Sequence, residues 1–183
     1  ARQSGLKVMI GHVRRFDLRY MEIHNCLVSG DVGRPVYIRR AERQWLPFPP
    51  QAWFWKPELG GGVILDIGAH IADLLRWYYE CDPDSVYAVG RRVREAACQA
   101  DSYDHALITY HFPDGAVGLA EASWAYPPDF GAGFYGSLDV VGTAGKIQYS
   151  DQDSQPMLIF DPETGVAFPR YFRFMSTTEQ AFE

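Results

Sequence analysis

The stretch of sequence that decides the fold is residues 59–77, which read LGGGVILDIGAHIADLLRW. After the three glycines, four side chains recur at helical spacing: Asp66, His70, Asp73 and Trp77. Residues at this spacing share one narrow stripe of a helix, and apolar side chains fill the stripe beside it. The pattern predicts a helix that is buried nearly all round, in which an acid–imidazole–acid row is costly unless it is paired or used.

Composition and charge narrow the class of protein. The 183 residues, 47% of them hydrophobic and 15% aromatic, suffice for one ordered domain with a core. A net charge of -6 argues against a nucleic-acid partner, because phosphate binding needs a basic surface. No apolar run reaches the roughly 20 residues of a membrane span, so we expect a cytoplasmic protein with no membrane partner. The cysteines are odd in number and far apart, which predicts reduced thiols used in packing: Cys26, Cys81 and Cys98.

Strand and turn signals fill most of the remaining chain. The turn Pro113-Asp114-Gly115 separates two apolar runs and predicts a hairpin of residues 103–112 and 116–126. The same signals predict two further hairpins, 138–141 with 147–149 and 157–160 with 166–168. Single strands are predicted at 6–10, 36–45 and 86–93. A helix is predicted from its cap at Asp17 to about Val28, before Ser29-Gly30.

These elements predict an α+β fold: a largely antiparallel, open-faced β-sheet with helices packed on one face. Three arginines of the strand 36–45 are interpreted as a solvated or paired strand face: Arg39, Arg40 and Arg43. Near the end of the chain, Ser176 and Glu179 form a capping-box pattern that announces a helix. Because few residues follow, far fewer than a stable helix needs, we expect the natural chain to be longer.

The helix of residues 62–77 carries the strongest indication of chemistry. A carboxylate at Asp66, one turn from the imidazole of His70, can fix its tautomer and raise its pKa, which suits proton transfer near neutral pH. The glycines before the helix would leave backbone amides open to an anion or ligand. The competing interpretation is structural: the acids bond nearby backbone or arginine groups, and His70 is a satisfied core residue.

Two other kinds of site were considered. Asp66, His70 and Asp73 could converge on a metal ion, although three ligands from one helix seldom close around one ion. Residues 131–136, GAGFYG, match the dinucleotide fingerprint G-x-G-x-x-G. That motif works only between a buried strand and a helix, and here a predicted strand follows it. We therefore do not interpret it as a phosphate loop.

The sequence resembles the Gfo/Idh/MocA oxidoreductases. The resemblance rests first on the family signature G-G-G-x-x-x-D-x-G-x-H-x-x-D, matched by Gly60-Gly61-Gly62, Asp66, Gly68, His70 and Asp73. Residues 11–17, GHVRRFD, are similar to the segment that opens the second domain of inositol-dehydrogenase-like members. Further matches, in family order, are residues 29–35, 112–116 and 141–145.

The resemblance implies that residues 1–183 are one substrate-binding and oligomerisation domain, a fragment without an N-terminal Rossmann domain and a C-terminal helix. NAD or NADP would belong to the whole enzyme, with no cofactor expected in the fragment. By position, His70 would be the general acid/base, and Asp66 would bind substrate and orient the histidine. Arg14 and Tyr135 would face the substrate. The family's Glu-Lys-Pro motif does not occur in this chain.

The expected function is therefore that of the substrate-binding, catalytic half of an NAD(P)-dependent oxidoreductase. It would act on a sugar or polyol hydroxyl by hydride transfer, and the fragment alone would be inactive. Two alternatives remain: a non-catalytic dimerisation or binding module of the same fold, and a metal-dependent enzyme using Asp66, His70 and Asp73. A homo-oligomer through the open sheet face is expected. The enzyme interpretation requires His70 and Asp66 to share a solvent-reachable hollow.

Overall fold

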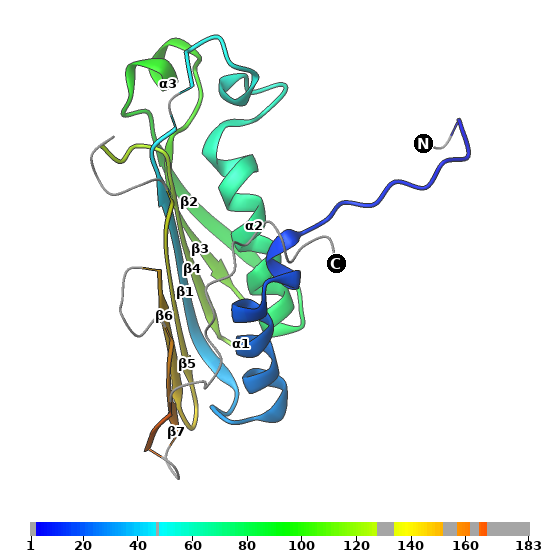
Figure 1. The fold of residues 1–183 in the computed structure, drawn as a ribbon, viewed down its shortest axis with the longest axis vertical. Coiled ribbons are helices and arrows are strands. Elements are labelled where there is room, and N and C mark those ends of the chain that lie inside the picture. Colours follow the sequence, from blue (N-terminus) through cyan, green and yellow to red (C-terminus); the bar gives the residue numbers. More distant parts are fainter. Residues whose placement is uncertain (1–2, 47, 128–133, 152–156, 162–164, 168–183) are drawn as a thin grey trace.

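One β-sheet organises the chain, and the two long helices cover one of its faces (Figure 1). The computed structural model describes residues 3–46, 48–127, 134–151, 157–161 and 165–167. Within them the sheet has eight strands in the order β2-β3-β4-β1-β5-β6-β7-β8. The predicted α+β fold with a largely antiparallel, open-faced sheet is confirmed.

The helices and strands follow one another in an order close to that predicted. The helical elements are η1 (Val13–Phe16), α1 (Leu18–Ser29), η2 (Trp53–Trp55), α2 (Gly62–Tyr79) and α3 (Glu95–Gln99). The strands are β1 (Pro35–Gln44), β2 (Ser85–Arg91), β3 (His105–His111), β4 (Val117–Ser123), β5 (Phe134–Gly142), β6 (Lys146–Ser150), β7 (Met157–Asp161) and β8 (Gly165–Ala167). The three predicted hairpins form: β3 with β4, β5 with β6, and β7 with β8.

Strand β1 lies at the centre of the sheet. It pairs in parallel with β4, where Arg40 lies beside Ala120, and antiparallel with β5, where Arg40 lies beside Leu138. Side chains alternate between the two faces of a strand. Ile38, Arg40 and Glu42 of β1 are therefore on one face and are buried there. That face is covered by α1 and α2 (Figure 1).

Local chemistry explains where α1 begins and ends. The carboxylate of Asp17 accepts a hydrogen bond from the backbone N–H of Arg19, as an N-cap does. At the other end Gly30 adopts a left-handed conformation with φ of 82°, which glycine tolerates best. Both predicted caps of this helix are confirmed. Its buried face consists of Tyr20, Ile23 and Cys26.

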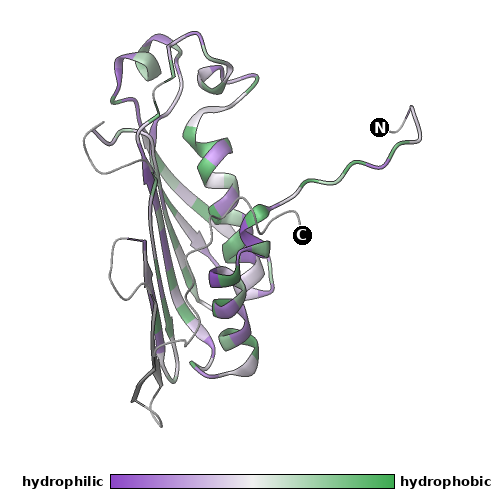
Figure 2. Cartoon of the chain, viewed as in Figure 1, coloured by the Kyte–Doolittle hydropathy of each residue, from purple (hydrophilic) through white to green (hydrophobic). Residues whose placement is uncertain are grey.

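Helix α2 packs its apolar side chains against the sheet but is not buried all round. Ile67, Ile71 and Leu74 are buried in the core. On the opposite side an exposed stripe runs along the helix through Leu65 and Arg76. Both helices carry hydrophilic and hydrophobic residues (Figure 2). The prediction of nearly complete burial is therefore wrong, because the sheet covers one side of α2 only.

Some other sequence predictions differ from the structure. Residues 6–10 belong to no strand among the described residues; they extend away from the sheet (Figure 1), with Met9 81% exposed. The short helix α3 was not predicted. Of the three free cysteines, Cys26 is buried as expected, whereas Cys81 and Cys98 are exposed and do not pack in the core. The capping-box residues 176–179 and the loop residues 131–133 lie outside the described residues.

Candidate active site

The polar stripe of α2 divides into two halves with different surroundings. Asp66 and His70, nearer the start of the helix, are half-buried, so neither is sealed in the interior. The charges of Arg14 from η1 and Glu42 from β1 act on both of them. Three elements thus bring these four side chains to one place. Asp73, in the second half of the stripe, binds a different partner.

Glu42 is the centre of a buried charge cluster. Its side chain is 1% exposed, and its Oε1 accepts hydrogen bonds from Arg40 Nε at 3.1 Å and Nη2 at 2.7 Å. Its Oε2 accepts a hydrogen bond from Arg14 Nη2 at 3.1 Å. Arg40 is fully buried, which would be very costly for an unpaired cation. Glu42 therefore stabilises Arg40 and holds Arg14 at the same time.

Burial and these charges shift the pKa values of the site. Burial lowers the pKa of His70 below its usual value and Arg14 lowers it further, while Glu42 and Asp66 oppose the shift. Asp66 thus acts in the predicted direction and raises the pKa of His70, but burial outweighs the carboxylate and the net shift is downward. Burial raises the pKa of Asp66. His70 is consequently neutral near pH 7 and able to accept a proton.

Hydrogen bonding at His70 also differs from the simplest expectation. Its Nδ1 is buried and has no hydrogen-bond partner among the described residues. Asp66 therefore influences the imidazole through its charge, and no hydrogen bond links it to His70 in the described part of the chain. A buried ring nitrogen without a partner is unusual in folded proteins, and a catalytic role is one of the explanations for it.

The second half of the stripe anchors α2 to the segment before α1. Asp73 is 6% exposed and accepts two hydrogen bonds from Arg15, from Nε and Nη2, both at 2.8 Å. Nε2 of His12 lies 3.8 Å from the same carboxylate. Trp77 stacks on His24 with ring centroids 4.2 Å apart. Asp73 is thus engaged with a guanidinium, and no cluster of three metal-ligating side chains occurs within the described ranges.

The glycines before α2 have a packing role that the sequence analysis missed. The amides of Gly60 and Gly61 donate to the carbonyl of Lys56, and the amide of Val63 donates to the carbonyl of Tyr103. A Cβ on Gly62 would lie 2.4 Å from Ser102 Oγ. These three amides are therefore not open to an anion, which contradicts the prediction for Gly60 and Gly61.

The two substrate-facing residues implied by the resemblance lie on different faces of the sheet. Arg14 is 14% exposed, and its guanidinium lies over the ring of Phe134, 4.9 Å from the centroid. Tyr135 is the next residue of β5 and points to the opposite face. There it lies beside Arg43, 5.3 Å from the guanidinium to the ring centroid. The structure does not bring Tyr135 together with His70; Phe134 is the β5 residue that lies against the Arg14 side chain.

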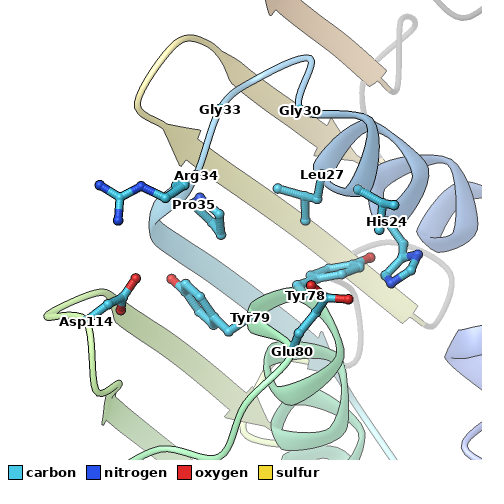
Figure 3. Close-up of a pocket in the computed structure, with 11 residues that line it drawn as sticks. His24, Leu27, Gly30, Gly33, Arg34, Pro35, Tyr78, Tyr79, Glu80 and Asp114 are labelled. Carbon is cyan, nitrogen blue, oxygen red and sulfur yellow. The ribbon is translucent and has the colours of Figure 1, made fainter.

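A pocket of about 390 Å³ lies beside the C-terminal end of α2 (Figure 3). Its walls include His24 and Leu27 of α1, Tyr79 and Glu80 at the end of α2, and Asp114 of the β3–β4 turn. In Figure 3 the side chains of Tyr79 and Asp114 lie near one another at one side of the opening. None of the predicted site residues lines this pocket.

Sequence reasoning missed Glu42 and Arg40. Both lie in the highly charged run RRAERQ, residues 39–44, whose arginines were interpreted as a solvated or paired strand face. Arg40 and Arg43 are indeed paired, with Glu42 and Glu121. A usable signal was present, because Ile38 is apolar and the same period of two continues through Arg40 and Glu42. A single apolar residue at the start of a charged strand was too little to assign the buried face.

Comparison with known proteins identifies the family of the chain. The family profile described as the GFO/IDH/MocA C-terminal domain matches residues 20–148. The chain belongs to this family of oxidoreductases, and the resemblance found in the sequence is confirmed. Among the described helices, none is both long and apolar enough to cross a membrane.

Its relatives include enzymes that act on inositols. The chain is 30% identical over 80% of its length to the scyllo-inositol 2-dehydrogenase (NAD(+)) of Bacillus subtilis, of which it covers 41%. It is 25% identical over 94% of its length to the myo-inositol 2-dehydrogenase of Thermotoga maritima, of which it covers 49%. The chain thus spans about half the length of the curated relatives it matches.

Solved structures share the fold. Levoglucosan dehydrogenase in complex with NADH and L-sorbose superposes with a TM-score of 0.74, at 19% identity, over 90% of this chain and 46% of the other. At this identity the likeness concerns the fold alone. It agrees with the open sheet and one-sided helices described above.

Proposed function

We propose that this chain forms the substrate-binding and catalytic half of an NAD(P)-dependent oxidoreductase that acts on a sugar or polyol hydroxyl. The observation that carries the proposal is His70: half-buried, with a lowered pKa and an unpartnered ring nitrogen, beside Asp66, Arg14 and Glu42. Such a perturbed histidine is suited to proton transfer. The inositol dehydrogenases among the relatives support the class of substrate.

In the proposed reaction each of these side chains has a separate role. In oxidation, neutral His70 takes the proton of the substrate hydroxyl as the carbon–hydrogen bond breaks, and in reduction it returns that proton to the carbonyl oxygen. Asp66, one turn earlier on α2, accepts a hydrogen bond from a substrate hydroxyl and stabilises the histidine when it is charged. Arg14 donates to a substrate oxygen. A bound nicotinamide would supply the acceptor or donor for the hydride of the substrate carbon.

The described residues do not offer a cradle for the whole dinucleotide. A phosphate-binding unit needs a strand, a glycine-rich turn and a helix whose first amides are free. The amides of Gly60, Gly61 and Val63 are used within the fold, and residue 134, directly after the fingerprint-like GAG, begins the strand β5. We therefore propose that a separate nucleotide-binding domain of the whole protein holds NAD or NADP, and that residues 1–183 alone are inactive.

The test uses the whole protein with inositols and other polyols, and it follows formation of NADH or NADPH. Replacing His70 by Asn should lower kcat by about 10²- to 10⁴-fold, the usual contribution of a general base. The control is His111→Asn, because His111 is an exposed histidine at the end of strand β3. A His70→Asn protein with full activity would contradict the proposal.

The pH profile provides an independent check. The proton-accepting form of His70 is the neutral one, and its lowered pKa keeps it neutral below the ordinary value of about 6.5. Oxidation by the wild-type protein should therefore keep its rate as the pH falls through 6.5 and decline only at lower pH. A decline centred above the ordinary histidine value would mean that another group controls the rate.

A dimerisation role for the open sheet face is a second, compatible proposal. Tyr87, Val89 and Leu107 lie together on this face and are 66%, 48% and 51% exposed. Exposed apolar side chains that adjoin one another are typical of an interface. Leu107→Asp should dissociate the whole protein in sedimentation experiments, whereas Val28→Asp on α1, at a residue 64% exposed, should not. A wild-type monomer would refute this proposal without affecting the first.

A further inference from the structure

Arg14 depends on one carboxylate for its position. It lies on η1, a single turn of 3-10 helix whose first residue has no side-chain cap. Of the described residues, Glu42 alone accepts a hydrogen bond from the Arg14 side chain, and Arg14 Nε is buried without a partner. The rings of Phe134 and Tyr20 lie near the guanidinium, at 4.9 Å and 5.7 Å from their centroids, but flat rings do not fix its direction.

Glu42 is itself fixed from behind. Arg40, two residues earlier on the same face of β1, donates two hydrogen bonds to Glu42 Oε1. This leaves Oε2 directed at Arg14 Nη2, 3.1 Å away. Both residues belong to the central strand of the sheet and are at most 1% exposed, so they have little freedom to move. The pair is a rigid support for a side chain on a short and weakly capped segment.

The neighbouring arginine fixes the other side of the same segment. Arg15 forms its two-point bond with Asp73 of α2, so η1 is tied to α2 by one arginine and to β1 by the next. The charges of Arg14 and Glu42 act on both Asp66 and His70 of α2. Loss of Glu42 would free Arg14 while leaving Arg15 in place.

We propose that Glu42, braced by Arg40, is a positioning residue that holds the Arg14 guanidinium beside Asp66 and His70 in the substrate site. The expected effect on catalysis rests on the proposed function. The role of Glu42 in holding Arg14 does not depend on that function. Glu42 has no direct role in proton transfer, because both of its oxygens are occupied by arginines. It acts by fixing the direction of Arg14, and through Arg14 the charge that His70 experiences.

The test is a cycle of variants in the whole protein, with the titration of His70 followed by NMR. His70 is assigned from the histidine signal that is lost in His70→Asn. The groups that face His70 are Asp66 on α2, Arg14 and His12 before α1, and Glu42 on β1. Because Arg14 lowers the pKa of His70, Arg14→Met should raise it in the wild-type background. In Glu42→Gln, where Arg14 is no longer held, the same replacement should change it little.

Activity provides the second readout. We expect Glu42→Gln to lose about 10²-fold in kcat/KM, the effect of a misplaced substrate-orienting group. Adding Arg14→Met to it should cost little more, because the two changes remove one interaction. Asp104→Asn is the matched control: Asp104 is a fully buried carboxylate that bonds the amides of Val93 and Arg94, and it should change neither readout.

The outcomes separate this inference from the proposed function. An equal upward shift of the His70 pKa by Arg14→Met in both backgrounds would overturn the positioning role, whether or not the protein turns over polyols. The expected titrations in a protein without NAD(P)-linked activity would uphold the positioning role and reject the proposed function. If Glu42→Gln does not fold, Glu42→Asp serves instead, because the shorter carboxylate keeps the charge but cannot reach both arginines.

Discussion

Two acid–arginine groups on neighbouring residues of β1 show how one strand places the same chemistry in different surroundings. On the helix-covered face, Glu42 joins Arg40 and Arg14, and the first two are at most 1% exposed. On the open face, Arg43 pairs with Glu121 of β4 through two hydrogen bonds, and their side chains are 12% and 15% exposed. One residue of register separates the two environments.

The difference teaches that residue type alone does not predict which charged group is functional. Both groups contain a carboxylate with its pKa lowered: burial alone would raise it, but arginines outweigh burial in each case. The Arg43–Glu121 pair satisfies its own hydrogen bonds within the sheet. The covered group leaves Arg14 Nε and Arg40 Nη1 buried without hydrogen-bond partners among the described residues. Because it has buried donors without partners, the covered group is the better candidate for a functional site.

The largest expected contrast is in stability. Glu42→Gln removes the carboxylate that is hydrogen-bonded to the fully buried Arg40 and should lower the free energy of unfolding by about 3–5 kcal/mol. Glu121→Gln weakens a charged hydrogen-bonded pair nearer to solvent and should lower it by about 1.5 kcal/mol. Urea unfolding of the two variants measures the difference. Equal losses would show that the two faces of β1 are energetically alike.

A backbone substitution tests how tightly the covered group is packed. Gly136 of β5 is the register partner of Glu42, and a Cβ there would lie 2.8 Å from Arg40 Nη1 and 2.6 Å from Asp151 Oδ2. Gly136→Ala should therefore cost about 1–3 kcal/mol, the usual effect of overpacking. Gly11→Ala is the control, since a Cβ at Gly11 meets nothing within 4 Å. A neutral Gly136→Ala would mean that the arginine can move aside.

The smallest expected effect concerns acid. The folded pKa values of Glu42 and Glu121 lie below the ordinary value of 4.5, so their stabilisation is complete well above 4.5 and is lost as the pH falls through their folded values. Between pH 7 and pH 4 each should contribute a loss of less than about 1 kcal/mol in the free energy of unfolding. Each Gln variant should remove its own share of this loss. An unchanged pH dependence in both variants would contradict the assigned pKa directions.

Local chemistry made much of the fold predictable. The β3–β4 hairpin followed from Pro113-Asp114-Gly115, and in the structure Asp114 accepts from the amide of Ala116 while Gly115 has φ of 85°. The caps of α1 followed from Asp17 and Gly30 in the same way. Such signals act over a few residues, and a sequence displays them directly. The types of the elements and the pairing of the hairpins could therefore be predicted from the sequence.

The site was less predictable because its properties arise from long-range packing. The direction of the His70 pKa shift depends on burial between α2 and β1, which spacing within α2 does not reveal. Tyr135 was predicted to face the substrate, but in the structure its neighbour Phe134 lies against Arg14 and Tyr135 lies beside Arg43, because adjacent residues of a strand point to opposite faces. The glycines before α2 were interpreted as a ligand site because their tertiary contacts with Tyr103 and Lys56 are invisible in the sequence.

The central position of β1 has a consequence for how the chain acquires its structure. Tyr37 pairs with Val117 on one side and with Val141 on the other, so both neighbours of this strand are made long after it. Contacts of such large sequence separation slow folding, because a long loop must close before they form. During synthesis Arg40 and Glu42 must remain hydrated until β4 and β5 emerge. Strands β4 and β5 therefore complete the burial of the charges. Nascent chains that end before β5 should consequently be bound by chaperones or cleaved by proteases more readily than longer ones.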